Sequence, residues 1–193
     1  MIFFFGGFRK DWCGPDADAR IRYCTSKKLA YIGYKCHLLC SAEDMTVLNF
    51  DITPANRHDS QMCIPIVIQA CSTHLKTLIK KLYGDNAYDI ERNRTFLEEH
   101  HIRVLFHTKE ETGKHPKNPV SAKKKSKKRS RVEALFGISQ ENLGFGRVNV
   151  RGLGRVFIDT AIIFSGWNFG ILYSYFINQF KDRISLKRLL YKS

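Results

Sequence analysis

The chain has 193 residues, of which 44% are hydrophobic and 26% are charged, so it is long and apolar enough for one folded domain rather than a disordered chain. It carries 32 Lys and Arg residues against 18 Asp and Glu, a net charge of +14. A charge of this size favours a polyanionic partner, first of all nucleic acid, over a merely basic surface, because each neutralised phosphate releases a counterion.

Six cysteines are scattered along the chain without a CxxC pair, and the N-terminal apolar run Ile2–Phe5 is too short for a secretory signal. We therefore expect reduced thiols. Cys36, His37 and Cys40 have the composition of a zinc half-site, but a second ligand pair is missing from the sequence, which favours simple burial.

The first predicted elements are two strands. Hydrophobic residues alternate with Gly33, Lys35 and His37 over residues 31–38, and the same period recurs over residues 48–52. A short polar segment at residues 41–44 joins them, so we expect an antiparallel hairpin of two half-buried strands.

Next, apolar residues at helical spacing predict a helix that Asp59 or Ser60 caps. A third strand is predicted over residues 78–83, ending at Gly84 and Asp85. Asp89 is the expected cap of a short helix that ends at about residue 99, and residues 102–106 are predicted to form a fourth strand.

The segment 109–130 is rich in Lys, Pro and Ser, which predicts a mobile basic loop. An amphipathic helix over residues 132–143 and an apolar helix over about 154–180 follow. The stretch 156–177 is long enough for a membrane span, but Asp159 within it favours a buried core helix.

Two acidic residues stand where phosphodiester chemistry would need them, because such chemistry uses two divalent ions that carboxylates hold about 3.5–4 Å apart. Asp85 directly follows the end of a predicted apolar strand. Glu133 lies in the first turn of a predicted helix that follows the basic run in the sequence. Taken singly, Asp85 is an ordinary turn residue and Glu133 an ordinary helix N-terminal acid.

Four segments resemble, in order, the signatures of DDE transposases of bacterial insertion sequences. They are Tyr34–His37, Thr53–Ser60, Gly84–Asp89 and Arg131–Gly137, and the resemblance covers roughly Asp16 to Asn168. The most specific is Thr-Pro-Ala-Asn-Arg-His-Asp-Ser at residues 53–60.

The resemblance implies an α/β, RNase H-like (retroviral-integrase-like) mixed sheet flanked by helices, and DNA transposition by Mg²⁺- or Mn²⁺-dependent nicking and strand transfer. Asp85 matches the second acid and Glu133 the third, both as metal ligands, and Arg129 matches the arginine that accompanies this glutamate. The expected DNA-binding residues are Lys123, Lys124, Lys125, Lys127, Lys128, Arg131, Arg147 and Arg151.

Two departures from the family pattern are visible. The first aspartate should close an N-terminal strand, yet only Asp11, Asp16 and Asp18 are available near the N-terminus, so we expect this strand to be missing or degenerate and the chain to be N-terminally truncated. Gln140 stands where the family tends to place a lysine. The alternatives are a non-catalytic DNA-binding remnant, or a basic protein anchored to a membrane through residues 156–177.

The expected organisation is an atypical segment at residues 1–19, a catalytic domain at 20–180 that contains the basic loop 109–130, and a basic tail at 181–193. The implied partners are double-stranded DNA, as terminal repeats and target, and a second copy in a synaptic complex. The implied location is the cytoplasm, at the nucleoid, without a membrane.

Overall fold

The computed structural model describes residues 2–5, 16–24, 29–72, 79–106, 119–146 and 148–177. Its largest sheet is built around one long strand, β3 (Leu29–Cys40). Three strands pair with β3 in antiparallel fashion: β1 (Ile2–Phe5), β2 (Arg20–Cys24) and β4 (Val47–Pro54). The predicted antiparallel hairpin is confirmed as β3 and β4.

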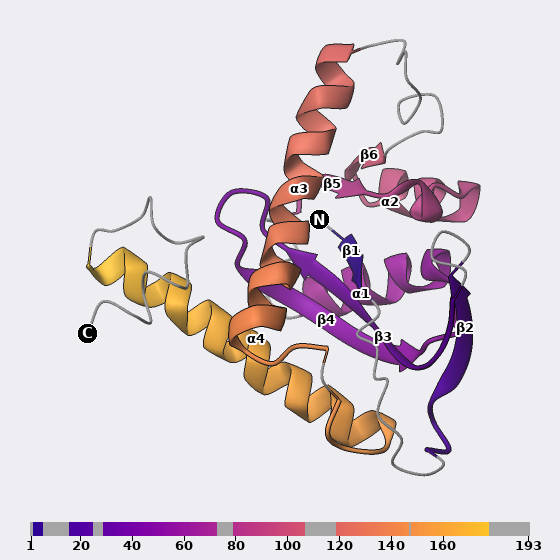
Figure 1. Ribbon diagram of the computed structural model, residues 1–193. Helices are drawn as coiled ribbons and strands as arrows, with labels where there is room; N and C mark the ends of the chain where they lie inside the picture. Colours follow the sequence, from indigo (N-terminus) through magenta and orange to yellow (C-terminus); the bar gives the residue numbers. More distant parts are fainter. Residues whose placement is uncertain are drawn as a thin grey trace.

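A second, parallel pair joins β5 (Lys81–Gly84) to β6 (Arg103–Phe106). The connection contains the 3₁₀ turn η3 (Asn86–Tyr88) and helix α2 (Glu91–Glu99). Because β1 contacts β5, the strands follow one another in the order β4, β3, β1, β5 and β6 (Figure 1). The structure thus has a strand at Ile2–Phe5, whereas the sequence predicts a first strand that is missing or degenerate.

Helices cover both faces of β3. On one face, the 3₁₀ turn η1 (Asp59–Met62) and α1 (Cys63–Ala70) form a core with α2, β5, β6 and Leu39. On the other face, α3 (Pro119–Asn142) and α4 (Leu153–Phe176) form a core with Tyr34 and the alternate residues that follow it in β3.

The expectation that β3 is half-buried is therefore wrong. Lys35 is 3% exposed and His37 is fully buried, although both lie on the polar side of the alternation. Polar side chains on one face of a strand indicate exposure to solvent only when no other element covers that face. Here η1 and α1 cover it.

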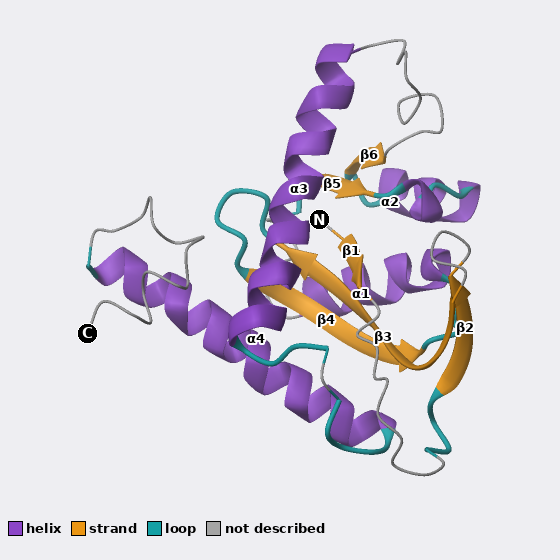
Figure 2. Ribbon diagram, in the orientation of Figure 1, coloured by secondary structure: helices purple, strands orange, loops and turns teal. Residues whose placement is uncertain are grey.

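The basic segment is also corrected. Residues 119–130, predicted as part of a mobile loop, form the first half of α3 (Figure 2), while residues 107–118 lie outside the described part of the chain. Lys, Arg and Ala are good helix formers, and Pro119 stands at the first helical position, where proline is favoured.

Both predicted caps differ from the structure. His58 caps η1, and its ring accepts a hydrogen bond from the Ser60 backbone N–H, while Asp59 turns toward the sheet. Ile90 occupies the N-cap of α2, and Asp89 forms an ion pair with Arg94 instead. In both cases the carboxylate that the sequence predicts as a helix cap instead pairs with a nearby cationic side chain.

Helix α4 lies against β4, at the end of the strand order opposite to β6. Asn168 bonds both the N–H and the C=O of Val47, at 2.8 and 2.9 Å, and Trp167 Nε1 donates to the Met45 carbonyl at 3.0 Å. By length and composition α4 could also cross a membrane, as the core helix of a soluble protein often could. The expected core role is borne out for the face that carries Trp167.

Candidate active site

Asp85 directly follows β5, at the start of η3. Its Oδ1 accepts a hydrogen bond from the Asn86 backbone N–H at 2.8 Å, and its side chain is half-buried. Gly84 lets β5 pass close to β6, because a Cβ at this position would come within 2.8 Å of the Phe106 ring. The strand end thus fixes the backbone from which Asp85 projects.

The turn that carries Asp85 is tied to the segment 53–60. Asn93, 1% exposed, donates from its amide to the carbonyls of Ser60 and Tyr88, both at 3.0 Å. Tyr88 is buried below the turn, and burial together with the carboxylates of Asp59 and Asp85 raises its pKa well above the ordinary range. Asn93 therefore holds η1 and η3 side by side.

A buried ion pair joins the segments 34–37 and 53–60. Lys35 Nζ donates to Asp59 Oδ1 at 2.5 Å and to the Arg57 carbonyl at 2.6 Å, and Arg22 stands 3.7 Å from the same carboxylate oxygen. Burial lowers the pKa of Lys35, and the Asp59 carboxylate opposes this effect. The charge of Lys35 is thus compensated by Asp59 inside the protein rather than by water.

Glu133 lies on α3, one residue beyond the buried Val132, and its side chain is exposed. Helix α3 contacts both β1 and β5, and Tyr83 of β5 packs against the cluster that contains Val132 and Phe136. The structure therefore brings together the two elements that carry Asp85 and Glu133.

The expected DNA-binding residues fall into three groups. Arg131 donates to the carbonyls of Ala42 and Glu43, both at 3.0 Å, and so anchors α3 to the β3–β4 turn. Arg151 is exposed ahead of α4. The side chains of Lys123, Lys124, Lys125, Lys127 and Lys128, and the whole of Arg147, lie outside the described residues. The side chain of Arg129, the expected companion of Glu133, also lies outside them.

Asp16 and Asp18, two candidates for the first acid, bond the N-terminus of α4. Asp16 Oδ2 accepts from the Tyr34 hydroxyl at 2.5 Å and from the Gly152 N–H at 3.1 Å, and Asp18 Oδ2 accepts from the Leu153 N–H at 2.9 Å. Partial burial raises the pKa of Asp16, but these hydrogen bonds outweigh it and lower the pKa overall. Both carboxylates act as caps supplied from far away in the sequence; Asp11 lies outside the described residues.

Among the residues that the structure describes, no three His, Cys, Asp or Glu side chains form a group that could hold a metal ion. In particular, the zinc half-site is not formed. Cys36 and Cys40 point into the core under α3 and α4, while His37 points to the opposite face and bonds Thr53 Oγ1 at 2.8 Å. Burial raises the pKa of Cys40 to about 11, as expected for an inert core thiol.

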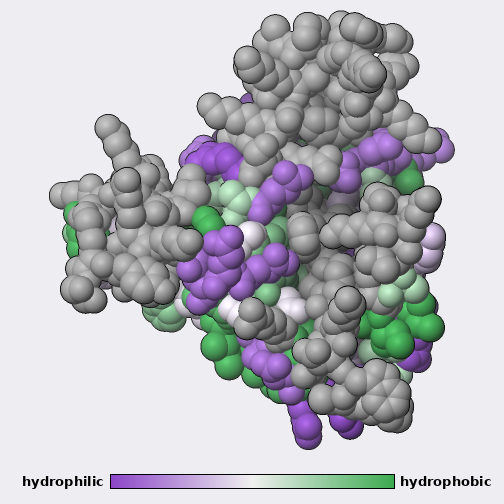
Figure 3. Space-filling view, viewed as in Figure 1, coloured by the Kyte–Doolittle hydropathy of each residue, from purple (hydrophilic) through white to green (hydrophobic). Residues whose placement is uncertain are grey.

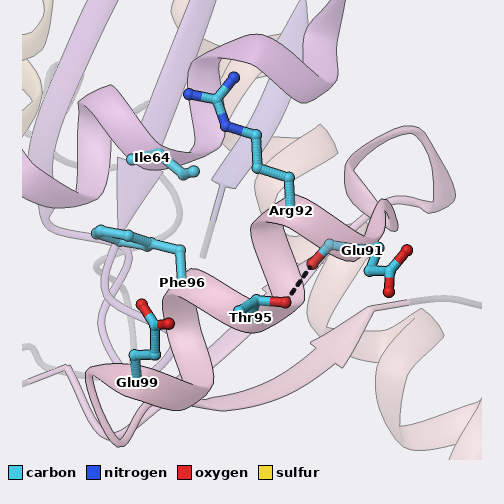
Figure 4. A pocket seen from close by; sticks show the side chains of 6 residues that line it. All are labelled: Ile64, Glu91, Arg92, Thr95, Phe96 and Glu99. Atoms are coloured by element: carbon cyan, nitrogen blue, oxygen red, sulfur yellow. Dashed lines mark hydrogen bonds between the residues drawn. The ribbon is translucent and has the colours of Figure 1, made fainter.

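A groove of about 580 Å³ lies between α1 and α2, away from Asp85 (Figure 4). Arg92 reaches toward Ile64 of α1, while Glu91 points away from the groove. It is lined by Ile64, Glu91, Arg92, Thr95, Phe96 and Glu99. Its few polar groups do not converge on a common point, so it lacks the usual features of a catalytic pocket.

Comparison with known proteins identifies the family of the chain. A family model described as a transposase DDE domain matches residues 10–169, which include Asp85, Glu133 and all four signature segments. No curated protein and no solved structure gives a match. Because the family model covers well over half of the chain, the protein belongs to the DDE transposase family.

Proposed function

We propose that this chain acts in DNA transposition, with Asp85 and Glu133 as ligands of the catalytic metal ions. The observation that carries the proposal is that Asp85 closes β5 while Glu133 lies on the helix that packs against β1 and β5. Both residues lie within the match to the transposase DDE domain. The reaction is nicking at the element's ends followed by strand transfer to a target.

The proposed fold is RNase H-like, with β1 as its first strand. Two features support it: an antiparallel unit β4–β3–β1 stands beside a parallel pair β5–β6, and helices cover both faces. In the sequence, Gly6 rather than an acidic residue follows β1.

The two carboxylates suit Mg²⁺ or Mn²⁺. Magnesium keeps several waters and is commonly held by one or two carboxylates plus substrate phosphates. Two carboxylates without a third can therefore supply the protein ligands of such a site. When bound, the ions would neutralise charge at the reacting phosphorus and activate the attacking oxygen. Asp85 and Glu133 would hold the ions, and the DNA phosphates would complete the coordination.

The basic half of α3 is the proposed DNA contact. It leads directly into the part of the same helix that carries Glu133, and the whole chain has a net charge of +14. The phosphate backbone of the terminal repeats or target would follow this helix toward the carboxylates, with affinity that falls steeply with salt. The setting we propose is the nucleoid, with two copies of the chain bringing two ends together.

The test is cleavage of DNA that carries the element's ends, with Mg²⁺, with Mn²⁺ and with a chelator. Asp85→Asn and Glu133→Gln should each lower the cleavage rate on the order of 10³-fold, because they weaken charge stabilisation in the transition state. Glu141→Gln, two turns further along α3, is the matched control and should cleave at the wild-type rate. Wild-type rates in Asp85→Asn would rule out the proposed metal site.

A non-catalytic DNA-binding role is the second candidate. It is favoured by Gly6 after β1 and by the lack of a three-ligand metal group among the described residues. It predicts that the chain binds DNA in a salt-dependent manner, as measured by fluorescence anisotropy, and that Asp85→Asn leaves this binding unchanged. It also predicts that the wild-type chain shows no metal-dependent cleavage. Cleavage that disappears in Asp85→Asn would decide against it.

A further inference from the structure

The outward face of α4 carries a regular apolar stripe. Large side chains recur at intervals of four and three residues on the side opposite to Trp167 and the core, and they are between 49% and 79% exposed. We call this set the α4 stripe: Ile158, Ile162, Phe169, Leu172 and Phe176. Ser165 occupies the third of the six positions that have this spacing. Figure 3 shows hydrophobic side chains along the lower part of the molecule, where α4 runs in Figure 1.

The spacing of the α4 stripe is that of a helix–helix seam. Alternating steps of four and three residues keep side chains on one line of a helix facing a partner helix. From its first to its last residue the stripe covers about 27 Å at a rise of about 1.5 Å per residue. An exposed apolar line of this length, broken only by the small Ser165, is unusual on a monomer and marks an interaction surface.

We propose that the α4 stripe is the surface through which two copies of this chain associate, helix against helix around a two-fold axis. The stripe carries no charged residue, whereas the chain as a whole has a net charge of +14. Two copies therefore repel each other over most of their surfaces and meet most favourably on an uncharged face. A nucleic acid, in contrast, has nothing to bind on this stripe.

The size of the α4 stripe fits a second copy. With typical side-chain areas, its exposed residues offer roughly 600 Å² per copy. A standard interface buries about 800 Å² per partner, so the stripe with its flanking residues approaches the area that a stable dimer requires.

The shape of the stripe favours an antiparallel pairing. Small residues, Ser165 and Gly166, stand near its midpoint, and a Cβ added at Gly166 would find no atom within 4 Å. Two helices can approach closely where their side chains are small. An axis near Ser165 places Ile158 and Ile162 of one copy against the aromatic end, Phe169 to Phe176, of the other, as a self-complementary two-fold contact requires.

The association leaves Asp85 accessible. Helix α4 lies against β4, whereas Asp85 follows β5, beyond β3 and β1 in the strand order. The dimer is thus independent of the chemistry proposed for the carboxylates.

The test is the mass of the full chain in solution, by sedimentation equilibrium between 1 and 100 µM, with Ile162→Lys and Phe169→Lys as variants. We expect a wild-type dimer and at least a 100-fold rise of the dimer dissociation constant in each variant, while circular dichroism shows an unchanged fold because both side chains are exposed. Ile68→Lys, at a 51% exposed residue of α1, is the matched control and should remain dimeric.

Three results would overturn the inference. One is a wild-type chain that is monomeric at 100 µM. Another is a dimer that persists in both stripe variants, since the contact would then lie elsewhere. The third is a wild-type chain that does not self-associate but sediments with phosphatidylcholine vesicles, while Ile162→Lys does not. This result would identify the stripe as a lipid-binding face.

Discussion

His37 should make the fold sensitive to mild acid. Burial, followed by the positive charges of Lys35, Arg57 and Arg22, lowers its pKa from 6.5 to about 3. The unfolded chain therefore takes up a proton at this residue as the pH falls below about 6.5, whereas the folded protein resists protonation until about pH 3. The contribution of His37 to the free energy of unfolding is therefore fully present above pH 6.5 and is lost as the pH falls toward 3. Between pH 7 and pH 5 the loss amounts to about 2 kcal/mol, at about 1.4 kcal/mol for each pH unit below 6.5.

The assay is urea unfolding at pH 7, 6 and 5, followed by tryptophan fluorescence, for the wild type and His37→Gln. The Gln amide can still bond Thr53 Oγ1 but cannot take up a proton, so the variant should lose about 2 kcal/mol less than the wild type between pH 7 and 5. His101→Asn, on the exposed turn before β6, controls for the loss of a histidine and suits the positive φ there. Equal losses in the wild type and His37→Gln would refute the reasoning.

Three further substitutions test the packing around the site by the same urea unfolding at pH 7. Gly84→Ala should destabilise the fold by about 1–3 kcal/mol because the new Cβ meets the Phe106 ring; an unchanged midpoint would contradict this contact. Gly137→Ala, in the middle of α3 with open space around it, should instead stabilise by about 0.5–1 kcal/mol, and a loss would mean that the site is not open. Lys35→Met should cost about 3–5 kcal/mol because it removes the buried partner of the Asp59 carboxylate and leaves only Arg22, 3.7 Å away; a loss below about 1 kcal/mol would show that Arg22 or water already compensates the charge of Asp59.

The parts of the fold that could be predicted from the sequence depend on local signals. The hairpin follows from a period of two on each side of a short polar turn, and the place of Asp85 follows from Gly84 at the end of an apolar run. The burial of Lys35 and His37 could not be predicted in this way. Periodicity reports which side chains share a face, but the coverage of that face depends on helices that come later in the chain.

Three other features lay beyond local signals. The basic run of α3 has the composition of a loop, yet Lys, Arg and Ala are also good helix formers, so composition alone does not separate a loop from a helix. Asp16 bonds the N–H of Gly152, 136 residues away, and only the tertiary fold brings a cap from such a distance. The dual character of α4, with one face in the core and another exposed, was likewise hidden in a uniformly apolar stretch.

The two most recognisable sequence segments, 34–37 and 53–60, supply none of the proposed ligands. They supply a buried ion pair, Lys35 with Asp59, and a backbone carbonyl, that of Ser60, which Asn93 ties to the turn after Asp85. A buried ion pair gains little stability over apolar packing but holds its partners in one geometry, so its value here lies in fixing the strand end. None of these contacts involves the position after β1. A chain with Gly6 at that position therefore keeps the support of Asp85 intact, and we expect the proposed metal-dependent cleavage to weaken while the fold and the proposed DNA contact of α3 persist.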